Sequence, residues 1–122
     1  METFGFKELT LWQKSMDLVD DVLTLTEKIT DSKRHFRLCE QLESAASSIP
    51  QNVAEGKGRN SKKEFIQFLY YSRGSAYEVV TLLNTFSRRN WITQEELEAL
   101  EKQLLEIVKM VKGLINSIQK SI

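Results

Sequence analysis

Hydrophobic residues, with a serine at two of the positions, recur at alternating steps of three and four along four long stretches of the chain. The third stretch carries them at Phe65, Leu69, Ser72, Ala76, Val79, Leu83 and Phe86. The fourth carries them at Leu97, Leu100, Leu104, Ile107, Val111, Leu114 and Ile118. The first has Ser15, Leu18, Val22, Leu25 and Ile29, and the second has Leu38, Leu42, Ala45 and Ile49. This spacing predicts four amphipathic helices, each with one apolar seam.

Polar residues at the start of these stretches indicate where the helices begin. In a capping box, a Ser or Thr side chain accepts from the third helical N–H, and a Glu or Gln there reaches back. The candidate pairs are Thr10 with Gln13, Ser61 with Glu64, and Thr93 with Glu96. Asp31 or Ser32 is the candidate cap of the remaining helix. The predicted helices span about residues 10–30, 35–57, 61–90 and 93–120.

The seams and the short connections together predict the architecture. Seams of this kind pack helices at roughly 20° to one another, as in bundles. Connections of a few residues make consecutive helices antiparallel. Five glycines and one proline in 122 residues are few for a sheet protein, which needs many turns. The sequence therefore predicts an all-α protein, with a single up-down-up-down four-helix bundle over residues 1–122.

Three of the predicted helices carry a second apolar stripe, which is more than one core-facing seam requires. The residues of this stripe that we take as a candidate oligomer interface are Trp12, Met16, Ile66, Tyr70, Tyr77 and Val80. Tyrosine suits such a surface because one end of its side chain is apolar and the other tolerates water. A broad core face within one protomer is the alternative interpretation, so both remain open at this point.

The chain's single proline lies inside the second predicted helix. Pro50 has no N–H and its ring pushes against the preceding turn, so we expect a kink there. The small residues before it, at 45–48, favour close approach of a neighbouring helix, and Gly74 in the third helix is the expected counterpart. Asn52 and Glu55 share one face near this point, which favours a structural role for both over catalysis.

The stretch "EGKGRNS" follows as the turn between the second and third helices. Gly56 and Gly58 are expected to stop the helix, because glycine tolerates the left-handed conformation after a helix end. Four cations lie in the seven residues 57–63, which we call the basic corner: Lys57, Arg59, Lys62 and Lys63. A helix start with basic neighbours is a candidate anion site, while a solvated charged turn is the alternative.

Charge is uneven along a chain whose formal net charge is zero. Residues 57–89 hold seven basic and two acidic side chains, so the remainder is acidic. We take Arg73, further along the third helix, as a candidate nucleic-acid contact together with the basic corner. Arg88 and Arg89 lie at the other end of that helix, so the basic residues do not form one continuous stripe.

The sequence offers little material for catalysis or for a metal site. His35 is the only histidine and Cys39 the only cysteine, which excludes an internal disulfide and favours a surface or helix-start histidine and a buried thiol. We therefore predict no enzyme, no metal and no cofactor. No apolar run approaches the roughly 18 residues that span a bilayer, and no signal peptide is evident, so we expect a cytoplasmic protein without a membrane partner.

The segment Ser48–Leu83 resembles the bacterial four-helix-bundle family named for proteins encoded in 23S ribosomal RNA intervening sequences. The matching positions are Pro50, Asn52, Glu55, Gly56, Glu64, Phe65, Leu69, Gly74, Ser75 and Glu78. The early "LWQKSMDLV" at 11–19 also looks like the start of the family, so the resemblance covers nearly the whole chain.

This resemblance implies a homo-oligomeric ring, a pentamer, with no attached enzymatic activity. The accessory variability proteins of diversity-generating retroelements are similar in fold and are implicated in binding nucleic acid and a reverse transcriptase. Those proteins are basic, whereas this chain is neutral. Two hypotheses follow: a ring that binds RNA or another nucleic acid through its basic corners, and an oligomeric scaffold for a protein partner.

Overall fold

The protein is an all-α bundle of four long helices. The structure, a computed structural model, describes residues 2–30 and 35–122. A short 3-10 helix, η1 (Gly5–Glu8), precedes α1 (Thr10–Thr30), α2 (Phe36–Lys57), α3 (Lys62–Arg88) and α4 (Gln94–Lys120). The described residues contain no strand. Each helix lies within two residues of its predicted bounds, which confirms the fold class.

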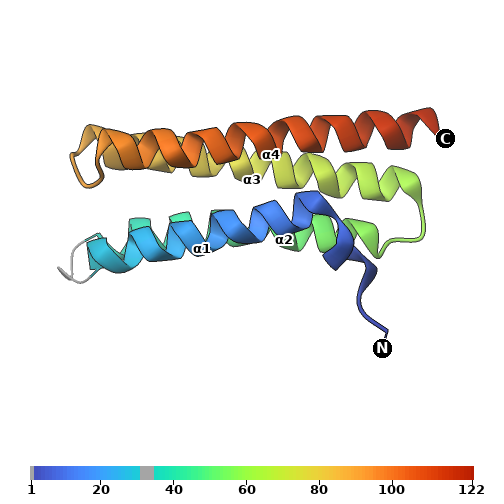
Figure 1. Cartoon of the computed structure of the whole chain (residues 1–122), viewed down its shortest axis with the longest axis horizontal. Helices are drawn as coiled ribbons and strands as arrows, with labels where there is room; N and C mark the ends of the chain where they lie inside the picture. The colour runs from blue at the N-terminus through green and yellow to red at the C-terminus, as the bar shows by residue number, and fades with distance from the viewer. Residues whose placement is uncertain (1, 31–34) are drawn as a thin grey trace.

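The helices follow one another back and forth along the bundle. Figure 1 shows the chain reversing direction at each connection, so that the N-terminal segment, the α2–α3 turn and the C-terminus lie at the same end. α1 packs against α2 and α4, and α3 packs against the same two helices. Residues far apart in sequence, around positions 57–63 and 121, are thereby brought to one end of the molecule.

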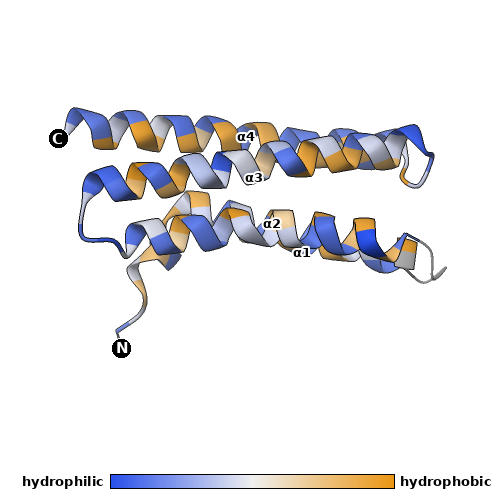
Figure 2. Cartoon of the chain, turned by 180° about the vertical axis from the view of Figure 1, so that it is seen from behind, coloured by the Kyte–Doolittle hydropathy of each residue, from blue (hydrophilic) through white to orange (hydrophobic). Residues whose placement is uncertain are grey.

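The core lies between the facing seams of the four helices. Hydrophobic and hydrophilic turns alternate along each helix, as expected when only one side is buried (Figure 2). The largest fully buried side chains include Leu18, Leu42, Leu83, Phe86 and Leu104. The predicted seam of α1 is buried throughout, whereas in α4 it drifts near the C-terminus, where Ile115 is buried and Leu114 and Ile118 are half-buried.

The three predicted capping boxes form to different extents. Thr93 and Glu96 make the complete box at the start of α4. The Ser61 hydroxyl accepts from the Glu64 N–H at 3.0 Å, which is half of a box. The predicted box at Thr10 is wrong: Thr10 is already helical, and the Gln13 amide donates to the Lys7 carbonyl oxygen at 2.8 Å. The Gln13 side chain thus bonds to η1, a short helix that the sequence analysis did not predict.

The start of α2 also differs from expectation. The candidate caps Asp31 and Ser32 lie outside the described residues. His35 occupies the N-cap position with a left-handed backbone (φ 61°) and no side-chain capping bond. Its ring stacks on Trp91, with 3.5 Å between ring centroids. His35 is thus a helix-start residue, as predicted, and Cys39 is buried.

The contact between α2 and α3 is built from small residues and hydroxyls. The Ser72 hydroxyl, fully buried, donates to the Ile49 carbonyl oxygen at 3.0 Å. The Ser48 and Ser75 hydroxyls hydrogen-bond to each other across the same contact. The expected close approach at the small residues 45–48 is therefore observed. α2 remains helical through Pro50, and the kink there stays a prediction.

Gly74 does not take part in this contact, contrary to prediction. A Cβ built on Gly74 would meet no atom within 4 Å, so the residue faces open space. The residues of α3 that contact α2 here are Ser72, through the Ile49 carbonyl oxygen, and Ser75, through the Ser48 hydroxyl. Two residues along a helix turn the side-chain direction by about 200°, and this separates Gly74 from Ser72.

Candidate nucleic-acid interface

The turn between α2 and α3 is tightened by backbone hydrogen bonds rather than by a left-handed glycine. The Gly58 N–H lies 3.2 Å from the carbonyl oxygens of both Ala54 and Glu55, and the Arg59 N–H donates to Gly56 at 3.1 Å. Gly58 has φ −80°, and no glycine of the described chain has a positive φ. The predicted left-handed stop is wrong, because short-range bonds of this kind satisfy the last carbonyls of α2.

Gly56 instead permits the close contact of α2 with α3. It stands inside α2 and is buried. A Cβ at this position would lie 2.7 Å from the Phe68 Cβ and 2.9 Å from the Phe65 Cδ1. Both distances are shorter than van der Waals contact allows, so only glycine fits without a shift. The first two turns of α3 are held against the end of α2 in this way.

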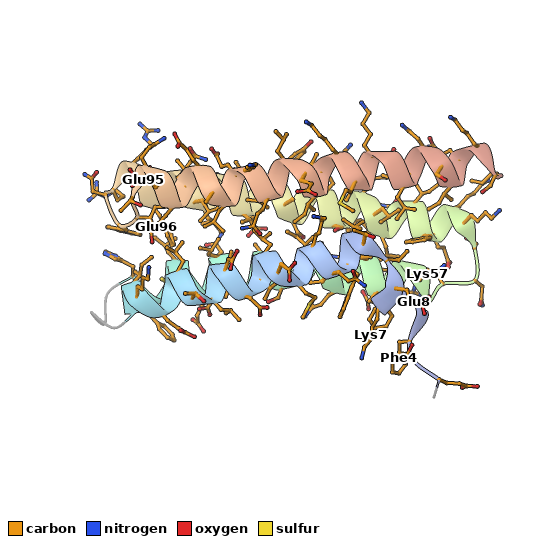
Figure 3. All side chains as sticks on the ribbon, viewed as in Figure 1. Phe4, Lys7, Glu8, Lys57, Glu95 and Glu96 are labelled. Carbon is orange, nitrogen blue, oxygen red and sulfur yellow. The ribbon has the colours of Figure 1, made fainter. Side chains whose placement is uncertain are left out.

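The four cations of the basic corner are exposed, and two of them lie beside aromatic rings of α3. The Lys57 Nζ lies 6.0 Å from the centre of the Phe65 ring, and the Arg59 Cζ lies 4.7 Å from that of Phe68. Figure 3 shows Lys57 at the end of the bundle that η1 occupies, with Glu95 and Glu96 at the opposite end. Cation–π contacts hold such side chains in place without neutralising their charge.

No carboxylate of the described chain forms an ion pair with these cations. The Lys62 Nζ donates to the Ser121 carbonyl oxygen at 3.1 Å, which links the corner to the end of α4. Glu55 and Glu64 are close in sequence and exposed, yet neither pairs with a cation. Four positive charges therefore remain available to an anion at this end of the bundle.

Arg73 belongs to a different surface. It lies eleven residues after Lys62, about 16 Å along α3. Its guanidinium carbon is 4.9 Å from the centre of the Tyr70 ring and 5.9 Å from that of Tyr77. The structure thus groups Arg73 with two predicted interface tyrosines rather than with the basic corner.

Of the six residues predicted for the oligomer interface, four line two grooves, Ile66 lies in the core, and Tyr70 is exposed beside Arg73 and lines neither groove. Trp12 and Met16 line a groove of about 300 Å³ between α1 and α2, which Pro50 also lines. Tyr77 and Val80 line a second groove, of about 390 Å³, between α3 and α4. Leu105 in this second groove is 57% exposed. Ile66 is only 9% exposed and belongs to the core.

Asn52 and Glu55, the polar pair in α2, differ in their side-chain contacts. The Asn52 amide donates to the Ser48 carbonyl oxygen, one turn earlier, at 2.8 Å. Glu55 is exposed, and its side chain makes no hydrogen bond within the described chain. Asn52 therefore supports the backbone beside Pro50, and Glu55 contributes only its carbonyl to the turn.

The remaining reactive groups do not form a second candidate site. Within residues 2–30 and 35–122, His, Cys, Asp and Glu side chains nowhere gather in threes as a metal site requires. Burial raises the pKa of the Cys39 thiol, and the nearby Glu43 carboxylate adds to this effect. A thiol with a raised pKa is a poor nucleophile at neutral pH. None of the described helices is both long and apolar enough to cross a bilayer.

Comparison with known proteins shows which family the chain belongs to. The family model described as 23S rRNA-intervening sequence protein matches residues 7–113. The chain belongs to this family. Its fold is similar to the crystal structure of a protein of unknown function from the S23 ribosomal protein family of Bacteroides thetaiotaomicron, with a TM-score of 0.83 and 24% identity. That match covers 87% of this chain and 98% of the other. No curated protein matches the chain.

Sequence reasoning missed the pairing of the corner cations with aromatic side chains. The residues Phe65, Phe68 and Tyr71 follow the cations on α3, and of these only Phe65 belongs to the predicted seam. The available signal was the alternation of basic and aromatic residues in "KGRNSKKEFIQFLYY". The bond from Lys62 to Ser121 could not be found in this way, since it depends on the length of α4.

Proposed function

We propose that this member of the 23S rRNA-intervening sequence family is a non-enzymatic, ring-forming helical bundle that binds RNA or another nucleic acid through its basic corner. The observation that carries this proposal is the set of four exposed cations, Lys57, Arg59, Lys62 and Lys63, without carboxylate partners in the described chain. Phosphate oxygens are the natural partners of such a cluster, and neutralising them releases counterions.

Ring assembly is supported by the two exposed grooves. The groove with Trp12 and Met16 lies on α1 and α2, and the groove with Tyr77 and Val80 lies on α3 and α4. Two different patches on one protomer suit a head-to-tail contact, which closes into a ring when the rotation allows it. A pentamer, as the family resemblance implies, would bring five basic corners together and strengthen binding by a chain whose net charge is zero.

An oligomeric scaffold that binds a protein partner and no nucleic acid is the second candidate function. The cluster of Tyr70, Arg73 and Tyr77 favours it, because tyrosine and arginine are among the residues enriched at energetically important interface positions. In this case the grooves would serve a partner protein as well as self-assembly. Salt dependence separates the two functions, since phosphate binding weakens steeply as salt rises.

The test uses two variants with the same change of charge on the same helix. Lys62→Glu/Lys63→Glu alters the basic corner, and Arg88→Glu/Arg89→Glu alters the opposite end of α3. Binding of a labelled, structured RNA is measured at low and moderate salt, after circular dichroism confirms equal helix content. We expect the first variant to lose binding and the second to retain it. Absence of binding by the unaltered protein at low salt would refute the proposal.

Light scattering tests the assembly. A mass corresponding to a multiple of the 14.2 kDa chain is expected, with five copies for the pentamer. A charged side chain introduced into one of the grooves should dissociate the oligomer. Leu105→Glu is the best variant for this test, because Leu105 is exposed in the protomer and its replacement leaves the core intact. A single-chain mass at micromolar concentration would refute the ring.

A further inference from the structure

A strip of aromatic side chains lies directly beside the basic corner. The Arg59 guanidinium lies over Phe68, with 4.7 Å from its carbon to the ring centre. The Phe68 and Tyr71 rings meet edge to face, with 5.6 Å between centroids and 85° between planes. We call Phe68 and Tyr71 the aromatic strip, which Arg59 joins to the basic corner. A cation and an exposed ring thus flank one shared phenylalanine.

The members of this strip differ in how firmly the fold holds them. Phe68 is half-buried and sits where a Cβ on Gly56 would collide with it, so its position is fixed by the α2–α3 contact. Tyr71 is 50% exposed, and its hydroxyl has no hydrogen-bond partner in the described chain. The core does not need the Tyr71 ring. A fixed phenylalanine therefore presents an exposed tyrosine next to a cation.

Paired and unpaired nucleotides offer different groups to a surface of this kind. A duplex conceals the faces of its bases and offers phosphates and groove edges, which a purely cationic surface can bind. Unpaired bases can stack on tyrosine and on the plane of an arginine guanidinium. Glu64 lies four residues before Phe68 and hence on the same side of α3. Its carboxylate disfavours a phosphate at the strip itself while leaving a base unaffected.

We infer that the corner takes single-stranded nucleic acid, with an unpaired base stacked on Tyr71 and the neighbouring phosphates held by the corner cations. This inference rests on the proposed nucleic-acid binding and specifies its substrate class. Lys57 and Lys63 supply the backbone contacts, and Arg59 lies between the phosphate-binding and base-stacking parts of the surface. Recognition is by stacking, so it tolerates any base sequence.

The experiment compares three labelled probes on the full chain by fluorescence anisotropy: a 12-nucleotide oligo(U), an oligo(dT) of the same length, and a blunt RNA duplex. We expect the single strands to bind more tightly than the duplex. Tyr71→Ala should weaken single-strand binding at least about fivefold and leave duplex binding unchanged, since one base stack contributes at least that factor. Tyr71→Phe keeps the ring and should retain binding.

A matched control removes an exposed aromatic ring elsewhere. Phe36 is 63% exposed at the start of α2, at the end of the bundle away from the corner, and Phe36→Ala should not change binding. Ultraviolet crosslinking of oligo(U), with mapping by mass spectrometry, should place the crosslink at Tyr71 or Phe68. Tighter binding of oligo(U) than of oligo(dT) would identify RNA as the strand preferred; equal binding would support stacking without regard to the sugar.

Two failures can be told apart. If single strand and duplex bind equally and Tyr71→Ala has no effect, the inference is overturned while the proposed function stands. If none of the three probes binds the unaltered protein at low salt, the proposed function itself is refuted. Equal helix content of the Tyr71 variants and the unaltered protein, by circular dichroism, ensures that a loss of binding is not a loss of fold.

Discussion

The close contact at Gly56 gives the sharpest prediction about stability. Substitution by alanine would place a Cβ 2.7 Å from the Phe68 Cβ and 3.3 Å from the Phe65 carbonyl oxygen. Ordinary contact begins at 3.4 Å, and both obstacles are fixed to the backbone of α3. Neither can turn aside as a flexible side chain would. Gly56→Ala must therefore push α2 and α3 apart at the basic corner.

The magnitude follows from two opposing terms. Overpacking a well-packed contact costs about 1–3 kcal/mol, toward the upper end here because the backbone must move. Alanine in a helix recovers about 1 kcal/mol relative to glycine. We expect a net loss of about 1–2 kcal/mol in the free energy of unfolding. For a chain of this size, this lowers Tm by roughly 3–10 °C.

Urea unfolding followed by circular dichroism measures this loss, at matched protein concentration because assembly also stabilises. Gly74 and Gly113 provide controls, since a Cβ at either would meet nothing within 4 Å. Alanine at these positions should raise stability by up to about 1 kcal/mol. Opposite signs for Gly56→Ala and the controls are the expected outcome. A Gly56→Ala protein as stable as the unaltered one would refute the reasoning about this contact.

Three further predictions concern hydrogen bonds, all measured by urea unfolding. Ser72→Ala removes the buried bond to Ile49 and should cost about 0.5–1.5 kcal/mol; no loss would show that the bond contributes nothing. Thr93→Ala should cost about 1 kcal/mol, whereas Thr10→Ala, which caps nothing, should change stability by less than about 0.5 kcal/mol; equal effects would contradict the helix starts described here. The hydrogen bond from the Thr93 N–H holds the pKa of Glu96 below its ordinary value of 4.5. The ionised Glu96 carboxylate therefore stabilises the fold above that pH, and this stabilisation is lost as pH falls through the pKa of the folded protein. The stability difference between the unaltered protein and Glu96→Gln should therefore shrink on acidification, and a constant difference would refute this.

The sequence predicted the helices because their periodic seams are long and uninterrupted. Seven seam positions along α3 and seven along α4, at steps of three and four, leave little choice of structure, so fold class and bounds followed directly. The effect of Pro50 could be predicted only in part. α2 stays helical there, and the nearby Asn52 amide donates to the Ser48 carbonyl oxygen rather than to that of Ala46, which Pro50 leaves without its helical N–H partner. A single sequence does not tell how far a helix bends at such a point.

The glycines show where pattern reading fails. The sequence predicts a helix stop at Gly56 and a close contact at Gly74, and the structure shows neither: Gly56 makes the close contact, and Gly74 faces outward in the middle of α3. Glycine has no side chain to mark a face, so its role depends on which neighbours surround it. Ser72 and Ser75 mark the side of α3 that faces α2, but this can be recognised only once the pairing of α2 with α3 is known.

The candidate site, too, could be predicted from the sequence only in part. The cations of residues 57–63 are adjacent in sequence, so their clustering was predictable. Arg73 was grouped with them by charge alone, and the structure places it instead between Tyr70 and Tyr77. The pairing of Arg59 with Phe68 arises because the turn folds back over α3. Contacts of this kind depend on turn geometry, which local residue preferences do not determine.

The salt dependence of single-strand binding tests the central claim most directly. Each phosphate neutralised on a single strand contributes about −0.7 to the slope of log K against log salt concentration, so four corner cations predict a slope of about −3 for one engaged corner. Lys62→Glu/Lys63→Glu should bring this slope to about half or less. A slope near zero for the unaltered protein, or one that this variant leaves unchanged, would contradict nucleic-acid binding at the basic corner.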